Sequence, residues 1–474
     1  MSKTNYKDLE KKLTMQKRNA WEVWDEKTKQ SAFKFSEGYK KFLNQSKTVP
    51  EAVAASMALV KQAGFKDMAE LKSLKAGDKV YAVNRDKSLF LAKVGKKPLN
   101  HGFNMIMPHI DSPHLDLKVM PLYEDESLAF LKTHYYGGIK KYQWPTIALA
   151  LHGQVYLENG KKVEINIGEK DSDPIFMITD LLPHIDRHGA PGSKVESKEV
   201  LGEELNLVVG SIPVKDEKIK EKVKLAILEY LWVEYGMKEI DLASAELRAV
   251  PCEKARDLGF DRSLISAFSQ DDLICAYTAL MGIIESKTSE KTQVLAMVDR
   301  EEIGSAGNTG ANSYFLEIFI SDLSELVDGE DDLDRVYKIF AKSQAISADV
   351  TAGLDPDYKD VFDVRNTCRL GYGLAIEKYT GHGGKYSTSE ASGKFMRELV
   401  ELYNKNKAIV YQLVGGMGKI DKGGGGTIAK YLANRNMEVI DAGVPLFNMH
   451  APLEISSKAD LYCAYLAYKA FLEN

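Results

Sequence analysis

One short stretch places the strongest constraint on how this chain folds. Residues 294–298 form an uninterrupted apolar run, and the acidic pair Glu301-Glu302 follows shortly after, before a Gly-Ser-Ala-Gly turn at residues 304–307. A bounded apolar run of this length is typical of a buried strand, and open α/β sheets collect catalytic groups at the carboxyl ends of such strands. Adjacent glutamates in an extended backbone point to opposite sides, so one can bind a metal while the other faces a substrate water. A solvated acidic turn is the simpler interpretation of an isolated pair, so the rest of the chain must decide.

A second apolar run ends in a histidine and an aspartate. His109 and Asp111 follow the segment at residues 104–107. Side chains two apart in an extended backbone project to the same side. This spacing suits an imidazole that binds a metal and is oriented by a neighbouring carboxylate. A His-Asp surface turn is the alternative interpretation of this segment alone.

Three further segments place similar groups at a helix start or a strand end. Asp271 and Asp272 begin a long apolar helix, and capping of its free N–H groups accounts for only one of them. Asp349 ends a strand-like segment, and His450 follows another short apolar run. The chain therefore repeats the same pattern at several separated positions.

Two histidines and three carboxylates at such positions suit two divalent ions that share a bridging carboxylate. The candidate ligands are His109, Asp271, Glu302, Asp349 and His450. Zn is the favoured ion, and Mn and Co also fit this ligand set. Two such ions polarise a substrate carbonyl and turn a shared water into a nucleophile, as in aminopeptidases. Glu301 is the candidate general base that takes the water proton and delivers it to the leaving amine.

Composition excludes several other classes of protein. The chain has 474 residues, a net charge of −5 and 44% hydrophobic residues, typical of a globular protein and unlike the basic balance of nucleic-acid binders. No stretch approaches the roughly 20 apolar residues of a membrane span, and the N-terminal segment has no apolar signal core. A reduced cytoplasmic protein is predicted, because no metal or redox spacing relates its cysteines, Cys252, Cys275, Cys368 and Cys463.

The domain organisation follows from where the candidate site residues lie. Residues 119–248 are β-rich and interrupt the α/β pattern, with a hairpin predicted over 154–167 and a helix over 216–235. Candidate site residues lie on both sides of this segment. The sequence therefore predicts a catalytic domain built from residues 1–118 and 249–474, with an inserted domain between its two parts.

Two other features of the chain are weaker signals. His184 and His188 lie in the inserted segment, and a surface or hydrogen-bonded role is a simpler interpretation for them than metal binding. The glycine run at residues 423–426 precedes a predicted helix but lacks the Gly-Lys-Ser/Thr of a P-loop and the dinucleotide-binding fingerprint. It predicts a close turn that supports the site.

The separated motifs together resemble the M18 family of aminopeptidases, the aspartyl-aminopeptidase-like enzymes of the wider MH clan. The resemblance runs from about residue 15 to the C-terminus. It rests on the order and approximate spacing of five motifs: His109-Ile110-Asp111-Ser112-Pro113, Gln270-Asp271-Asp272, Asp299-Arg300-Glu301-Glu302-Ile303-Gly304-Ser305, Ser347-Ala348-Asp349 and Met449-His450.

The resemblance implies a specific role for each matched residue. Asp271 would bridge the two metals, His109 and Asp349 would complete one site and Glu302 and His450 the other, Glu301 would be the general base, and Asp111 would orient His109. Substrate contacts would come from Lys378, Tyr386 and Met449.

The resemblance also implies an architecture and an assembly. The fold class would be α/β, a phosphorylase/hydrolase-like three-layer catalytic domain with an inserted β-rich dimerisation domain. Dimers would assemble into a tetrahedral homo-dodecamer, and a histidine of the neighbouring subunit, His184 or His188, would reach the active site. The partners would be peptides, with no nucleic acid and no membrane.

The chain departs from the family pattern in ways that concern specificity. Ile110 stands where the family has Thr, and residues 270–273 read Gln-Asp-Asp-Leu, which indicates a divergent bacterial branch. Lys378 could pair with an acidic substrate side chain or be a solvated lysine. The removed N-terminal residue is therefore either acidic (Asp or Glu) or neutral.

Two alternative classes of function remain open from the sequence. The first is another metallohydrolase of the same fold, such as an M42-type aminopeptidase, an M20-type deacylase or a carboxypeptidase. The second is a catalytically inactive assembly or binding protein, against which the retention of all five ligands and Glu301 argues.

Overall fold

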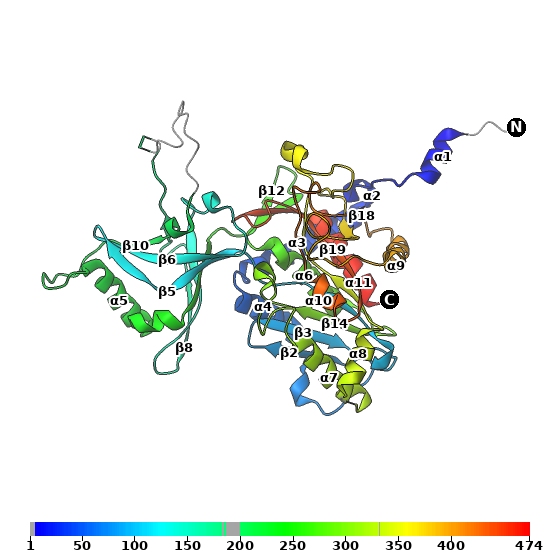
Figure 1. Cartoon of the computed structure of the whole chain (residues 1–474), viewed down its shortest axis with the longest axis horizontal. Coiled ribbons are helices and arrows are strands. Elements are labelled where there is room, and N and C mark those ends of the chain that lie inside the picture. Colours follow the sequence, from blue (N-terminus) through cyan, green and yellow to red (C-terminus); the bar gives the residue numbers. More distant parts are fainter. Residues whose placement is uncertain (1–4, 183, 186–199, 331) are drawn as a thin grey trace.

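A central mixed sheet carries the larger part of the molecule in this computed structural model, which describes residues 5–182, 184–185, 200–330 and 332–474 (Figure 1). Within those ranges the sheet has nine strands, in the spatial order β1 (Lys66–Asp67), β2 (Lys79–Asn84), β3 (Ser88–Lys93), β14 (Thr292–Met297), β4 (Phe103–Met107), β15 (Gln344–Ser347), β19 (Glu438–Gly443), β17 (Leu374–Glu377) and β18 (Tyr411–Val414).

The four middle strands β14, β4, β15 and β19 run parallel to one another. Their carboxyl ends therefore lie at one edge of the sheet. β14 and β4 are buried along their whole length and are mostly apolar rather than alternating, as expected for strands of a parallel sheet covered on both faces.

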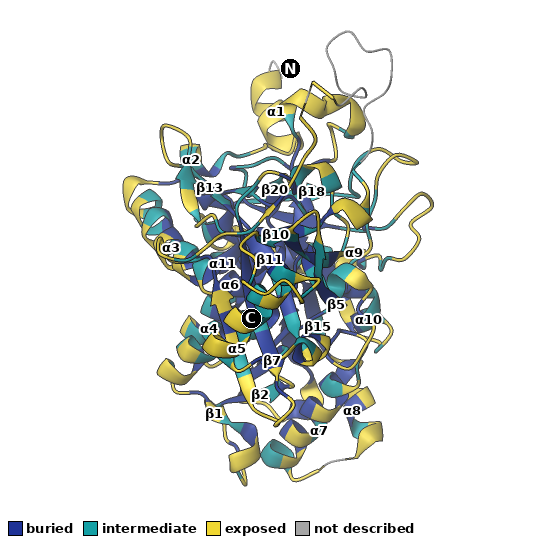
Figure 2. Ribbon diagram, turned by 90° about the vertical axis from the view of Figure 1, so that its left-hand side faces the viewer, coloured by how far each residue is buried: buried dark blue, intermediate teal, exposed yellow. Residues whose placement is uncertain are grey.

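Helices cover both faces of this sheet, which gives three layers. Alternate residues of β14 point into different cores: Leu295 and Met297 pack into one, and Val294 and Ala296 into the other. The first core is closed by α3 (Glu26–Asn44), α4 (Val49–Gln62), α6 (Gln270–Glu285), α9 (Gly393–Asn404) and α11 (Lys458–Leu472). The second is closed by α7 (Phe315–Asp328), α8 (Leu333–Phe340) and α10 (Ala429–Ala433). Figure 2 shows the buried strands in the middle and the exposed outer faces of the helices. This arrangement confirms the predicted α/β fold class.

A second sheet forms a lobe beside the first, on the left of Figure 1. In the described part of the chain it has seven strands, in the order β8 (Lys162–Ile167), β7 (Leu149–Tyr156), β11 (Glu246–Pro251), β5 (His114–Asp125), β6 (Leu128–Tyr136), β10 (Leu207–Gly210) and β9 (Met177–Ile178). The helix α5 (Lys222–Tyr235) packs on it through Val223, Ile227 and Leu231. The division into domains at residues 118 and 249 stays a prediction.

A small third sheet borders the carboxyl edge of the central one. Over the described residues its five strands are, in order, β12 (Arg256–Leu258), β13 (Leu264–Ala267), β21 (Glu454–Ser457), β20 (Pro445–Phe447) and β16 (Thr351–Ala352). The short helices α1 (Tyr6–Leu13) and α2 (Ala20–Val23) precede α3 at the N-terminal end.

Local sequence patterns predicted several of these elements correctly. The predicted hairpin over 154–167 is formed by β7 and β8. The predicted helix over 216–235 begins six residues late, at Lys222. Its first turn is fixed by the Glu124 carboxylate of β5, which accepts hydrogen bonds from the N–H groups of Val223 (2.8 Å) and Lys224 (2.9 Å). A cap supplied by a distant strand leaves no periodic signal in the helix sequence itself.

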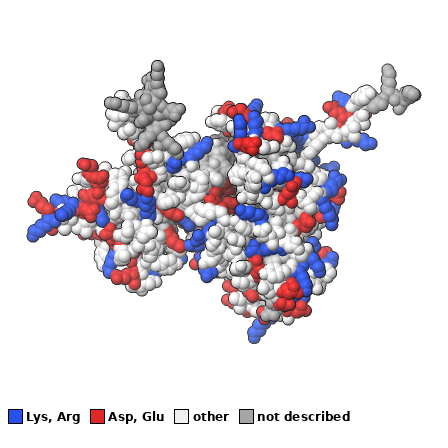
Figure 3. All heavy atoms as spheres, viewed as in Figure 1, with Lys and Arg blue, Asp and Glu red and all other residues white. Residues whose placement is uncertain are grey.

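The surface carries charges of both signs. Figure 3 shows lysines, arginines, aspartates and glutamates interspersed over the visible face, without a continuous basic area. Across the residues that the structure describes, no helix is long and apolar enough to cross a membrane.

Candidate metal centre and substrate pocket

The predicted site residues meet in one pocket at the carboxyl edge of the central sheet. It has a volume of about 170 Å³. Several parallel strands end at this edge, so residues distant in the sequence converge there. His109 follows β4, Asp349 follows β15, the pair Glu301 and Glu302 follows β14, Asp271 begins α6, and His450 lies between β20 and β21.

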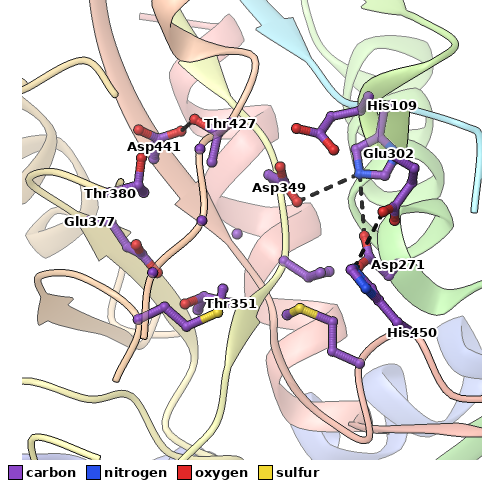
Figure 4. A pocket seen from close by; sticks show the side chains of 18 of the residues that line it. His109, Asp271, Glu302, Asp349, Thr351, Glu377, Thr380, Thr427, Asp441 and His450 are labelled. Carbon is purple, nitrogen blue, oxygen red and sulfur yellow. Dashed lines mark hydrogen bonds and ion pairs between the residues drawn. The ribbon is translucent and has the colours of Figure 1, made fainter. Parts of the chain in front are cut away.

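The Asp271 carboxylate lies between the two histidines (Figure 4). Its Oδ1 is 3.2 Å from His109 Nε2, and its Oδ2 is 3.2 Å from His450 Nε2. The outer carboxylates complete the two halves: Asp349 Oδ1 is 3.6 Å from His109 Nε2, and Glu302 Oε2 is 3.4 Å from His450 Nε2. The five predicted ligands thus form two neighbouring groups that share one carboxylate.

Each histidine is oriented by a backbone carbonyl behind it. His109 Nδ1 lies 3.0 Å from the carbonyl oxygen of Asp111, and His450 Nδ1 lies 2.7 Å from that of Gly138. With the proton on Nδ1 donated to these carbonyls, both Nε2 atoms present a lone pair to the pocket. Gly138 lies just beyond β6, so the second sheet positions a residue of the pocket.

The Asp111 carboxylate organises the turn that carries the two glutamates. It lies 3.4 Å from His109 Nδ1 and accepts hydrogen bonds from the N–H groups of Glu301 (3.1 Å) and Glu302 (3.2 Å). The Tyr136 hydroxyl donates to it as well, at 2.8 Å. Asp111 was predicted to orient His109. It also holds the backbone of Glu301 and Glu302 in place.

Two residues of the centre were not predicted to have a role there. The buried Glu454 accepts hydrogen bonds from the N–H groups of Asp271 (3.0 Å) and His450 (2.9 Å). The Asp272 carboxylate accepts from the His109 N–H at 3.3 Å, and its ligand atoms lie within 4.8 Å of those of His109 and Asp349. In the sequence, Glu454 is only an acidic residue at the start of a short strand, β21. That pattern does not distinguish it from other acidic residues of the chain.

The electrostatics of the pocket call for a cation. Burial, together with the charge of Asp349, raises the pKa of Glu301 to about 8, and burial together with Asp271 raises the pKa of Glu302 well above its ordinary value. Burial opposes ionisation of Asp271 too, but hydrogen bonds from His109 and His450 hold its pKa below the usual range. Buried carboxylates in excess of the imidazoles are costly unless a positive ion compensates them.

A metal fits this donor set. Glu302 Oε1 is buried and has no hydrogen-bond partner among the described residues. The ligand atoms of His109, Asp271 and Glu302 all lie within 4.8 Å of one another. Imidazole nitrogens and carboxylate oxygens are ligands of Zn, Mn and Co.

The other half of the pocket is lined by polar side chains and glycine backbone. The side chains are Thr351, Glu377, Thr380, Thr427 and Asp441 (Figure 4). Gly424, Gly425 and Gly426 form part of the wall, as predicted for a close turn at the site. A Cβ atom on Gly426 would lie 2.6 Å from the Ser387 carbonyl oxygen, so the backbones approach too closely for a side chain.

The remaining substrate-binding candidates are distributed differently. Met449 lines the pocket, whereas Lys378 and Tyr386 do not. Lys378 Nζ lies 3.7 Å from Glu390 Oε1, and the Tyr386 side chain is exposed. His184 lies exposed in a turn outside the pocket lining, and His188 lies outside the described residues.

The three-layer fold and this cluster of imidazoles and carboxylates define a metallohydrolase. The family model described as aminopeptidase I zinc metalloprotease (M18) matches residues 42–472. The chain therefore belongs to the M18 family and is a metalloaminopeptidase, as the five motifs predicted. This assignment decides against the M42, M20, carboxypeptidase and non-enzyme alternatives.

Relatives and solved structures agree with this assignment. A probable M18 family aminopeptidase 1 of Borrelia garinii subsp. bavariensis is 45% identical over 97% of this chain and 100% of its own. The crystal structure of an M18 aminopeptidase from Thermotoga maritima has a TM-score of 0.91 and 41% identity, covering 97% of this chain and all of that one. The S. cerevisiae mApe1 dodecamer, at a TM-score of 0.74, 20% identity and 94% coverage of this chain (97% of its own), has the same fold.

Proposed function

We propose that this chain removes N-terminal residues from peptides with two divalent metal ions, preferably Zn, bound in the pocket. Asp271 would bridge the two ions, His109 and Asp349 would complete one site, and Glu302 and His450 would complete the other. The observation that carries this proposal is that the two oxygens of one carboxylate, Asp271, each lie 3.2 Å from a different histidine. That is the arrangement a bridging ligand requires.

Residues around the metals carry the proton transfers. When bound, two divalent ions polarise the substrate carbonyl and lower the pKa of a water molecule. Glu301 lines the pocket without belonging to either group of ligands. Its carboxylate takes the proton of the attacking water and delivers it to the leaving amine. The hydrogen bond from its N–H to Asp111 holds the Glu301 backbone in place for this transfer.

We further propose a cytoplasmic homo-oligomer, a tetrahedral dodecamer built from dimers that associate through residues 119–248. The shared fold of the mApe1 dodecamer supports this assembly. In it, His184 or His188 of a neighbouring subunit reaches the pocket. The absence of disulfides among the four cysteines supports a reducing compartment.

The test is hydrolysis of a panel of aminoacyl chromogenic substrates by metal-stripped protein, with Zn, Mn or Co added back. Cleavage that depends on added metal, together with two bound ions per chain, is the expected result. No cleavage by protein that holds two ions would contradict the aminopeptidase reaction. A stoichiometry of one ion per chain in the active protein would contradict the dinuclear centre.

A further inference from the structure

Beyond the metal centre the pocket holds a second pair of carboxylates, Glu377 and Asp441. They stand directly opposite each other on the neighbouring antiparallel strands β17 and β19. Directly opposite residues project from the same face of a sheet. Both side chains line the pocket, on the side away from His450 and Asp271 (Figure 4). Each residue is only 5% exposed.

One carboxylate oxygen of Glu377 has no hydrogen-bond partner inside the described protein. This oxygen, Oε1, is buried, and Thr351 is the side chain that hydrogen-bonds to the carboxyl group. Asp441 Oδ1 accepts from the Thr427 hydroxyl at 2.7 Å. A buried carboxylate oxygen without a donor is costly, so a hydrogen-donating group bound against the Glu377 carboxyl group would relieve that cost.

In the described part of the chain, no lysine or arginine neutralises this pair. None of the described residues that line the pocket is a lysine or an arginine. The neighbouring Lys378 turns away and pairs with Glu390, which also accepts from Lys385 at 3.0 Å. Burial, with the charges of Asp441 and Asp349, raises the pKa of Glu377 to about 8, as expected for a carboxylate without a cation beside it.

The rest of the wall suits a long, unbranched side chain. Met417 and Met449 provide apolar surface, and the glycine backbone at Gly424, Gly425 and Gly426 leaves room that side chains would fill. Lysine and arginine combine an apolar stem with a charged, hydrogen-donating tip. An aspartate or glutamate of the substrate would instead place a third carboxyl group beside this pair, with no lysine or arginine among the described lining residues to compensate it.

We propose that Glu377 and Asp441 form an acidic subsite that binds the cationic side chain of an N-terminal lysine or arginine. This proposal rests on the proposed aminopeptidase function and names its preferred substrate class. In this proposal Glu377, the residue next to Lys378, contributes to the substrate preference. The preferred N-terminal residue is then basic, whereas pairing with Lys378 would favour an acidic one.

The experiment compares kcat/KM of the metal-loaded full-length enzyme for lysyl, arginyl, norleucyl, methionyl, aspartyl and glutamyl chromogenic substrates. Norleucine matches the unbranched stem of lysine without its charge. We expect lysyl and arginyl substrates to exceed the norleucyl one by about tenfold or more, since hydrogen bonds to charged groups are the strong ones. An active enzyme that prefers neutral or acidic residues would overturn the subsite and leave the aminopeptidase function standing.

Two isosteric variants locate the effect. Glu377→Gln and Asp441→Asn should each lower kcat/KM for lysyl and arginyl substrates by about tenfold or more and change norleucyl cleavage by less than about threefold. Glu390→Gln is the matched control, because it removes a carboxylate that pairs with Lys378 outside the pocket; its selectivity should stay that of the wild type. If either well-folded variant lost kcat/KM equally on all substrates, Glu377 and Asp441 would instead bind the α-amino group of the substrate or maintain the shape of the pocket. That result would overturn the proposal.

A measurement of ligand binding tests the acidic subsite independently of whether the protein catalyses the aminopeptidase reaction. Calorimetry with lysine amide and norleucine amide on metal-loaded Glu301→Gln protein reports the subsite without turnover, because the active enzyme would hydrolyse both amides. Tighter binding of lysine amide that Glu377→Gln abolishes supports the subsite even if the protein cleaves nothing. Equal binding of the two amides to a folded, metal-loaded protein contradicts it.

Discussion

The carboxylate of Glu454 accepts a hydrogen bond from the backbone N–H of Asp271 at 3.0 Å. Its other oxygen accepts from the N–H of His450 at 2.9 Å. One buried side chain therefore fixes the backbone of two proposed metal ligands, Asp271 and His450. Groups that orient ligands in this way tune metal affinity as well as geometry.

Glu454→Gln should weaken metal binding without removing a ligand. The amide keeps one acceptor oxygen, but its NH₂ group is a donor and cannot accept a hydrogen bond. The N–H group of either Asp271 or His450 therefore loses its acceptor, and the backbone there is held less firmly. We expect a loss of about 10–100-fold in zinc affinity or in kcat/KM, measured by zinc titration of the stripped protein and by kinetics at saturating zinc. Glu473→Gln is the control, because Glu473 accepts the N–H of Lys287 on the surface. An unchanged zinc affinity and an unchanged rate would contradict a positioning role for Glu454.

Glu301→Gln should separate catalysis from metal binding. The amide cannot take up the proton of the attacking water, and a general base contributes about 10²–10⁴-fold to the rate. We expect kcat to fall by about that factor while the protein keeps two metal ions, measured by metal analysis of the same samples used for kinetics. Near-normal turnover in this variant would remove Glu301 as the base.

Asp271→Ala should abolish turnover and weaken metal binding at the same time. The substitution takes away both oxygens that face the two histidines, so each half of the centre loses a ligand. We expect at most one tightly bound ion and no measurable turnover, determined by metal analysis after dialysis and by the same assay. If the variant retained two ions at wild-type affinity, another carboxylate would be the bridge, and Asp272, near His109 and Asp349, would be the next candidate.

The sequence predicted the parts of the site that lie directly beyond strands. His109, Glu302 and Asp349 each follow an apolar run, and parallel strands bring such ends to one edge of the sheet. Each of these positions could therefore be recognised from a few neighbouring residues.

The groups that the sequence did not reveal depend on contacts between distant segments. Gly138 reaches His450 from the second sheet, and Glu454 reaches Asp271 from a short strand of the third. Glu377 and Asp441 become neighbours only because β17 pairs with β19, although they lie far apart in the chain. A strand order of this kind is a property of the whole fold and leaves no local pattern.

The contact between the two lobes should make stability depend on pH through His152. This buried histidine of β7 lies between two carboxylates: its Nδ1 is 2.8 Å from Glu51 of α4, and its Nε2 is 3.1 Å from Glu169. Lys47 also faces this group, with Nζ 2.6 Å from Glu169. Burial lowers the pKa of His152, but the hydrogen bonds to Glu169 and Glu51 outweigh it, and the net pKa is raised.

A raised folded-state pKa means that the charged imidazole stabilises the fold. The contribution is complete below the unfolded pKa of about 6.5 and is lost as pH rises through the folded-state value. His152→Gln should therefore destabilise the protein most at low pH, by on the order of 1–3 kcal/mol, and less as pH increases above about 6.5. Thermal melting of both proteins between pH 5.5 and 9 measures this difference in Tm. His134→Gln is the control, because His134 is exposed, and it should change Tm only slightly. A His152→Gln difference that stayed constant over the range, or grew with pH, would show that the imidazole is not held charged between Glu51 and Glu169.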